Sequence, residues 1–284
     1  MALITKPPIA KPAVGRKDAD NRRRCGAAIL TIIWLVGFGA CFKSDQALFD
    51  GAEQLWLKDE YSRAADKLKL LVAEYPDSAK VSQAYYRLGE IYYLNLDNPN
   101  KALDYFIKVT KLEGKTELNL KSHKYIADIY QQALGNYNLA ILQYQRILND
   151  FRDIIKADEY MLNIGKMYYK KGACPQAIIE YQALLKEFPK SDFALEASYH
   201  IANCMIIDGE AKEAKIIYEK ALLDYPENKY KYGIMLGIGA CYEELDQLEK
   251  ALLTYEKMRE AFPGKKLVKK KINSAKKRIK ARKR

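Results

Sequence analysis

The most constraining feature of this chain is a pattern that recurs about every 37 residues. An alanine returns at intervals of 38, 38, 37, 37 and 37 residues, and a large apolar or aromatic side chain follows each one four residues later. Because residues i and i+4 share one face of an α-helix, the pattern predicts a series of similar helices that pack against equivalent neighbours. The pairs are Ala64 and Leu68, Ala102 and Phe106, Ala140 and Tyr144, Ala177 and Tyr181, Ala214 and Tyr218, and Ala251 and Tyr255.

A second small residue lies upstream in each unit, three residues before another large side chain. Each unit is therefore expected to hold two helices joined by a short polar turn, such as 171–173 or 208–210. In four units a proline ends the second helix, because proline lacks an N–H and disfavours helix in the residue before it. The upstream pairs are Ala52 and Leu55, Gly89 and Tyr92, Ala127 and Tyr130, Gly165 and Tyr168, Ala202 and Met205, and Gly239 and Tyr242.

These features together resemble the tetratricopeptide repeat (TPR), with units at 45–81, 82–119, 120–157, 158–194, 195–231 and 232–264. The resemblance implies an all-α fold: a right-handed α-solenoid of six helix pairs, without catalytic chemistry of its own. The phrases at 75–78 and 84–93 are also loosely similar to two bacterial groups. These are the outer-membrane assembly lipoproteins and the Tol-Pal-associated periplasmic TPR proteins.

The net charge of +12 is concentrated at the two ends of the chain. Residues 265–284 carry twelve Lys and Arg and no acid, and residues 1–24 carry seven basic and two acidic side chains, so 25–264 has a net charge of −5. Residues 1–24 are expected to be a disordered basic stub. The body of the protein is therefore mildly acidic, and nucleic acid is not the favoured partner because the basic last helix is expected to lie outside the cytoplasm.

Residues 25–42 form an uncharged run of 18 residues, preceded by three arginines and followed by Lys43. Spanning a bilayer takes about 20 apolar residues, so this run is predicted to be a signal or transmembrane segment. The arginines on its N-terminal side favour an orientation in which the repeats face the bacterial periplasm. Residues 38–41 resemble a lipobox, so lipidation of Cys41 and an uncleaved signal anchor are both open.

The last twenty residues read as a basic amphipathic helix. Val268, Ile272, Ala275 and Ile279 form an apolar stripe that is expected to cap the last repeat. The charge exceeds what capping needs, so the helix is also predicted to bind an anionic surface, such as lipid headgroups or lipopolysaccharide phosphates. An acidic partner is an alternative ligand, and nucleic acid ranks well behind. The residues expected to bind the anionic surface are Lys269, Lys270, Lys276, Lys277 and Arg278.

The TPR resemblance implies a groove lined by the first helix of each unit, which binds a protein or peptide partner. A carboxylate clamp is not expected there, because Lys124 is followed at the next groove position by Asp128 rather than by Asn. The aromatic side chains have packing between repeats as their alternative role. The groove residues assigned in this way are Phe49, Glu53, Trp56, Tyr86, Glu90, Tyr93, Lys124, Asp128, Tyr169 and Tyr199.

Catalysis, metal binding and a cofactor are not expected. The chain has only two histidines, His123 and His200, and neither stands at metal-ligand spacing from a cysteine or carboxylate. No phosphate-binding loop or nucleophile motif occurs. Cys204 and Cys241 occupy equivalent repeat positions and are expected to be small buried apolar residues rather than a disulfide.

The sequence thus predicts a membrane-tethered, non-catalytic TPR scaffold or adaptor that serves a bacterial envelope assembly machine. A cell-wall or division coordinator of the Tol-Pal type is one alternative. A targeting receptor whose repeats face the cytosol is another, and it differs in the side of the membrane that the repeats occupy.

Overall fold

The computed structural model describes residues 44–112, 114–260, 262 and 264–282, and every regular element in these ranges is a helix. The described residues divide into two compact units, one that ends at Asp97 and one that begins at Asn98. The predicted stub, the apolar run at 25–42 and Cys41 lie outside the described residues.

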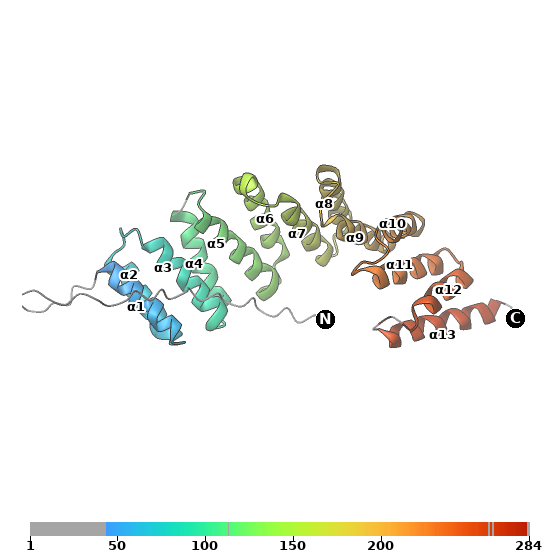
Figure 1. Cartoon of the computed structure of the whole chain (residues 1–284), viewed down its shortest axis with the longest axis horizontal. Coiled ribbons are helices and arrows are strands. Elements are labelled where there is room, and N and C mark those ends of the chain that lie inside the picture. Colours follow the sequence, from blue (N-terminus) through green and yellow to red (C-terminus); the bar gives the residue numbers. More distant parts are fainter. Residues whose placement is uncertain (1–43, 113, 261, 263, 283–284) are drawn as a thin grey trace, which may run out of the picture. The chain divides into compact units, whose positions relative to one another are not determined.

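The first unit contains α1 (Asp45–Leu57), α2 (Tyr61–Glu74), α3 (Val81–Glu90) and a π-helical turn, η1 (Ile91–Asn95). Helix α1 begins after Ser44, whose hydroxyl accepts a hydrogen bond from the Ala47 N–H and so satisfies one of the free donors of the first turn. Helix α2 packs against both α1 and α3 (Figure 1).

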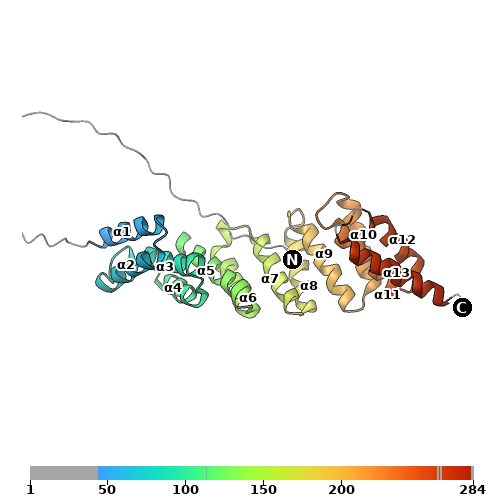
Figure 2. The same cartoon turned by 90° about the horizontal axis from the view of Figure 1, so that it is seen from below.

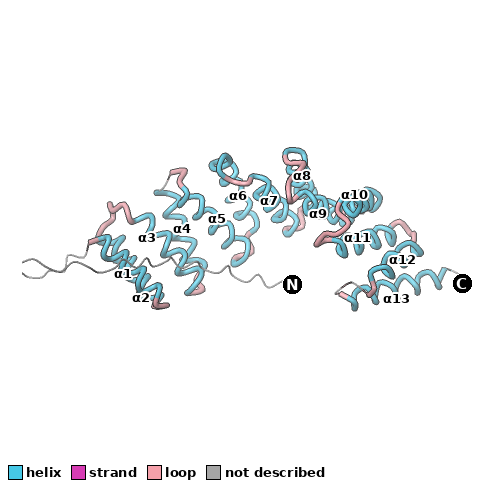
Figure 3. The backbone as a smooth tube through the Cα atoms, viewed as in Figure 1, coloured by secondary structure: helices cyan, strands magenta, loops and turns pink. Residues whose placement is uncertain are grey.

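In the second unit each helix packs against the next one along the chain (Figures 1 and 2). Short loops join them (Figure 3). The elements are α4 (Pro99–Leu112), α5 (Glu117–Asp128), η2 (Ile129–Ala133), α6 (Tyr137–Phe151), η3 (Arg152–Ile154), α7 (Ala157–Lys170), α8 (Cys174–Glu187), α9 (Ala194–Ile207), α10 (Ala211–Asp224), α11 (Lys231–Glu244), α12 (Leu248–Met258) and α13 (Lys265–Arg282).

The repeating small and large residues form the contacts that the sequence predicts. All six repeat alanines are fully buried, as are five of the six large residues that follow them. A Cβ added at Gly165 would lie 2.5 Å from the ring of Tyr181, so glycine is what lets this ring lie against α7. Cys204 and Cys241 are also fully buried, as expected.

The turn between the two helices of a pair always contains a residue with positive φ. The spacing of these residues follows the 38- and 37-residue intervals of the alanines. Three are glycines, which adopt this conformation without strain, and three are aspartates, which tolerate it better than most residues. They are Asp59, Asp97, Gly135, Gly172, Gly209 and Asp246.

The two π-helical turns have a cause in the sequence. The first small residue and the repeat alanine are 13 residues apart in two of the six repeats, from Gly89 to Ala102 and from Ala127 to Ala140. They are 12 residues apart in the other four repeats. The extra residue is absorbed as a hydrogen bond that spans five residues, from the Leu96 N–H to the Ile91 carbonyl and from Leu134 to Ile129.

Candidate binding sites

Arg87 pairs with two acids on the first-helix face of the first compact unit, the face formed by α1 and α3. Its guanidinium donates to both carboxylate oxygens of Glu53, at 2.6 and 2.9 Å, and to Glu90 at 2.7 Å. Burial opposes the charge of Arg87, but Glu90 and Glu53 outweigh this effect and raise its pKa. The two carboxylates predicted to line the groove therefore already share a cation of this chain.

The aromatic side chains predicted for this face differ in exposure. Trp56 is only 6% exposed, lies 4.8 Å from the Arg87 guanidinium, and donates its indole N–H to Asn95 at 3.4 Å. Phe49, Tyr86 and Tyr93 are half-buried. These three offer more surface than Trp56, and contact with a partner stays a prediction for all four.

In the second unit the predicted groove residues are engaged with their neighbours. Lys124 is exposed, and its ammonium lies 5.7 Å from the centre of the Tyr160 ring. Asp128 is half-buried and accepts a hydrogen bond from Gln132. Their side chains do not form the pattern of a carboxylate clamp, in which Lys and Asn act together, and their role in partner binding stays a prediction.

Tyr169 and Tyr199 belong to an aromatic cluster around His200. Their ring centres lie 5.2 and 5.4 Å from that of His200, and Tyr199 stacks on Tyr230 at 5.0 Å. Part of their surface is therefore used in packing between repeats, the alternative that the sequence leaves open.

Glu196 lies beside this cluster and is 8% exposed. It pairs with Lys166 and with Lys229, the latter at 3.3 Å, while the His200 Nε2 lies 3.9 Å away. His200 and Lys166 hold the pKa of the Glu196 carboxyl well below its usual range, against the opposing effect of burial. The ion pairs of Glu196 with Lys166 and Lys229 stabilise the junction of α7, α9 and the loop before α11.

Helix α13 packs its apolar stripe on α12, which confirms the capping prediction. Val268 and Ala275 are fully buried, and Ile272 is nearly so. Three of its cations pair with acids of the last repeat: Lys271 with Glu243 at 2.7 Å, Lys276 with Glu256 at 2.9 Å, and Arg282 with Asp246. Lys269, Lys270, Lys277 and Arg278 are exposed, and within the described residues they have no acidic partner.

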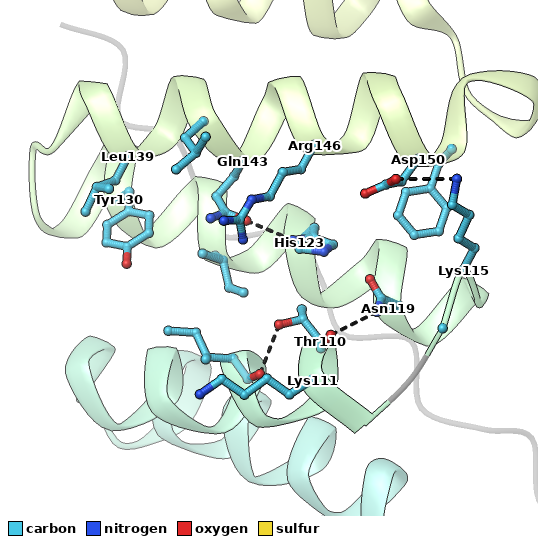
Figure 4. A pocket seen from close by; sticks show the side chains of 15 residues that line it. Thr110, Lys111, Lys115, Asn119, His123, Tyr130, Leu139, Gln143, Arg146 and Asp150 are labelled. Carbon is cyan, nitrogen blue, oxygen red and sulfur yellow. Dashed lines mark hydrogen bonds and ion pairs between the residues drawn. The ribbon is translucent and has the colours of Figure 1, made fainter.

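The structure contains a hollow of about 610 Å³ between α4, α5 and α6 (Figure 4), which was not predicted from the sequence. His123, 6% exposed, lies on its floor, and its Nδ1 is 2.8 Å from the Gln143 Oε1. Since Gln143 offers an oxygen there, Nδ1 carries the proton and donates it. Asn119 donates to the Thr110 carbonyl at 3.4 Å on the same floor.

The hollow combines apolar and charged walls. Ile126, Leu139 and Phe151 supply apolar surface. Burial and the nearby Arg146 lower the pKa of His123, against the effects of Gln143 and Asp150. The imidazole is therefore neutral at neutral pH, so its Nε2 is a hydrogen-bond acceptor.

Metal and membrane sites can be assessed only for the described part of the chain. Within it, no three His, Cys, Asp or Glu side chains are grouped in a way that would hold a metal ion. Likewise, none of the helices there combines the length and the apolar character that crossing a bilayer requires.

Comparisons with known proteins agree on the class of fold. Family models described as tetratricopeptide repeat match residues 82–116, 159–191 and 234–264. No curated protein matches the chain. These three stretches are therefore tetratricopeptide repeats, and stacked helix pairs of this kind generally serve as non-catalytic scaffolds for protein contacts.

Solved structures of low sequence identity share this fold. The C-terminal part of a TPR repeat-containing protein from Cytophaga hutchinsonii is 21% identical with a TM-score of 0.55, over 75% of this chain and 78% of the other. PilW, a type IV pilus biogenesis factor, is 15% identical with a TM-score of 0.50, over 81% and 97%. A chain of the Naa15/Naa10 complex bound to HypK-THB is 16% identical with a TM-score of 0.60, over 82% of this chain but only 34% of its own.

Proposed function

We propose that the protein is a non-catalytic, membrane-tethered adaptor whose first-helix faces bind a protein or peptide partner in a bacterial envelope assembly machine. The half-buried aromatic side chains of the first unit, Phe49, Tyr86 and Tyr93, carry this proposal. Aromatic residues in well-packed surroundings supply most of the binding energy at many interfaces. Because Arg87 already pairs with both Glu53 and Glu90, apolar anchors of the partner are expected to contribute more here than a basic residue.

Photo-crosslinking in cells tests this surface. A crosslinking residue at Tyr93 or Tyr86 is expected to yield a defined adduct. The matched control carries the crosslinking residue at Ile179, which is 62% exposed on α8, the second helix of its repeat. This control is expected to yield no adduct. If Tyr86→Ala and Tyr93→Ala leave every adduct and interaction intact, the first-helix face is not the binding surface.

The tether and the periplasmic location rest on the sequence of residues 22–42. The shared fold with a type IV pilus biogenesis factor suits a role in envelope assembly. Reporter fusions at residue 44 test the orientation: periplasmic reporter activity supports the adaptor, and cytosolic activity supports a targeting receptor instead. Acyl labelling of wild type and Cys41→Ala separates a lipoprotein from an uncleaved anchor.

We further propose that α13 binds anionic membrane lipid through the cations that the last repeat leaves unpaired. The test is flotation with phosphatidylglycerol vesicles after changing Lys269, Lys270, Lys277 and Arg278 to glutamine. Binding is expected to fall and to lose its salt dependence. Lys271→Gln with Lys276→Gln is the control, because it removes two charges that already pair within the protein. Because the variant removes four charges and the control two, an equal loss per charge removed would show that total charge, not this face, decides binding.

A further inference from the structure

The hollow between α4, α5 and α6 has a counterpart two repeats later. Helices α8, α9 and α10 enclose about 440 Å³ in the same way. Residues at matching repeat positions line the walls of both: Ile126 and Ile201, Arg146 and Lys220, Asp150 and Asp224, Phe151 and Tyr225. The two hollows therefore occupy equivalent places in the repeat array.

The floors of the two hollows differ in polarity. Asn119, His123 and Gln143 floor the first, and Ala194, Ser198 and Ile217 stand at the matching positions of the second. Five polar or charged residues are buried in the described part of the chain, and three of them are on this floor. Burying such groups has a free-energy cost, and the second hollow shows that the repeats stack without them.

The mouth of the first hollow carries unbalanced positive charge. Lys115 pairs with Asp150 at 3.4 Å, which uses the acid of the lining. Lys111 on α4 and Arg146 on α6 line the hollow from different walls (Figure 4). Neither has an acidic partner among the described residues, so both are available to an anion.

The floor offers a matched donor and acceptor. With Nδ1 donating to Gln143, the neutral His123 presents Nε2 as an acceptor, and the Gln143 amide nitrogen is a donor. A peptide group carries one N–H and one C=O and so complements this pair. The apolar wall of Ile126, Leu139 and Phe151 suits an aliphatic side chain.

We propose that this hollow is a second binding site, distinct from the first-helix face, and that it takes an acidic peptide segment of a partner protein. A carboxylate of the peptide lies between Lys111 and Arg146, and its backbone contacts the His123–Gln143 pair. An apolar side chain of the peptide packs on Leu139 and Leu142. The volume lies within the range of about 300–1,000 Å³ that is usual for ligand sites.

The two histidines make a direct test possible, because the chain has no others. The full chain, labelled at histidine and held in detergent, is titrated with a blocked hexapeptide that has two glutamates between leucines. The ring resonances of His123 are expected to shift in a saturable way while those of His200 stay in place. The matching glutamine peptide is expected to bind at least tenfold more weakly.

Two variants locate the site. His123→Ser with Gln143→Ile gives the first hollow two of the three floor residues of the second, and peptide affinity measured by fluorescence anisotropy is expected to fall at least tenfold. Arg146→Ala is expected to remove most of the preference for glutamate over glutamine. The α13 glutamine variant described above is the control and should bind the peptide like wild type.

Several results would overturn the proposal. They are no shift of His123, equal binding of the glutamate and glutamine peptides, and affinity that survives the floor exchange but not the α13 variant. Free glutarate that binds as tightly as the peptide would show a site for small organic anions instead.

Discussion

The hollow floored by His123 and the hollow floored by Ser198 share their walls and differ in their floors. Ile126 and Ile201 occupy one repeat position and Phe151 and Tyr225 another, because these residues also hold neighbouring helices together. The floor positions differ in polarity, with Asn119, His123 and Gln143 in the first hollow and Ala194, Ser198 and Ile217 in the second. On the proposal above, the polar floor of the first hollow serves its ligand, whereas the shared walls serve the packing of the repeats.

The largest expected effect comes from making the second floor polar. Ile217 packs against the core clusters on both sides of it, so Ile217→Gln removes apolar contacts and places an amide where no histidine faces it. We expect a loss of about 3 kcal/mol in unfolding free energy, measured by urea denaturation.

Adding Ser198→His to this variant sharpens the comparison. The new imidazole stands where His123 stands in the first hollow, so it is expected to restore about 1 kcal/mol through a hydrogen bond to the new amide. If Ile217→Gln alone lowers the unfolding free energy by less than about 1 kcal/mol, a polar floor has little effect on stability in either hollow. The buried polar groups of the first hollow would then need no ligand to explain them.

A smaller loss is expected from breaking the polar pair of the first floor. His123→Ala leaves the buried Gln143 amide without its partner, which should lower the unfolding free energy by about 2 kcal/mol. The matched change, Ser198→Ala, should lower it by less than about 0.5 kcal/mol, because the Ser198 hydroxyl donates only to the Ala194 carbonyl of its own helix. Equal losses would mean that the hydrogen bond between His123 and Gln143 contributes little to the unfolding free energy.

The sequence was sufficient for the helix pairs, their turns and the apolar stripe of α13, because each depends on spacing within one unit. The alanines that define the period are all fully buried, and glycines at 172 and 209 do form the turns. Helix α13 caps the last repeat through Val268 and Ile272, as their spacing predicts.

The features that were missed depend on comparison between units or on contacts across them. The extra residue between Gly89 and Ala102 was visible in the sequence and signals the π-helical turn. His123 aligns with Met161, Ser198 and Met235 in the repeat register, which marks it as unusual. The pairing of Arg87 with Glu53 joins residues 34 positions apart and has no signal in either helix alone.

The pH dependence of stability separates the two floors further. Burial, helped by Arg146, lowers the pKa of His123 below 6.5, so the folded state prefers the neutral imidazole. Its contribution is fully present above pH 6.5 and is lost as the pH falls through the folded-state pKa. The loss is at most about 1.4 kcal/mol per pH unit.

Urea denaturation between pH 8 and pH 5 measures this loss. The wild type is expected to lose more stability than His123→Ser, which carries serine as the second hollow does. The carboxyl of Glu196, whose pKa is strongly lowered, titrates at more acidic pH and contributes equally to both proteins. Parallel pH profiles would show that His123 titrates in the folded protein as it does in the unfolded chain.

The smallest effect is expected at the rim, where the two hollows carry the same acid. Asp150 pairs with Lys115 at 3.4 Å, and both side chains are exposed, whereas Asp224 has no cationic partner among the described residues. Exposed ion pairs contribute little, so Asp150→Asn should cost no more than about 0.5 kcal/mol at low salt and less at high salt. Asp224→Asn should change nothing measurable. In peptide binding the effect of Asp150→Asn has the opposite sign. This variant leaves a third unbalanced cation at the mouth of the first hollow and should strengthen binding of the glutamate hexapeptide. If Asp150→Asn alters stability but leaves the affinity for the glutamate hexapeptide unchanged, the charge at the rim does not act on the ligand site.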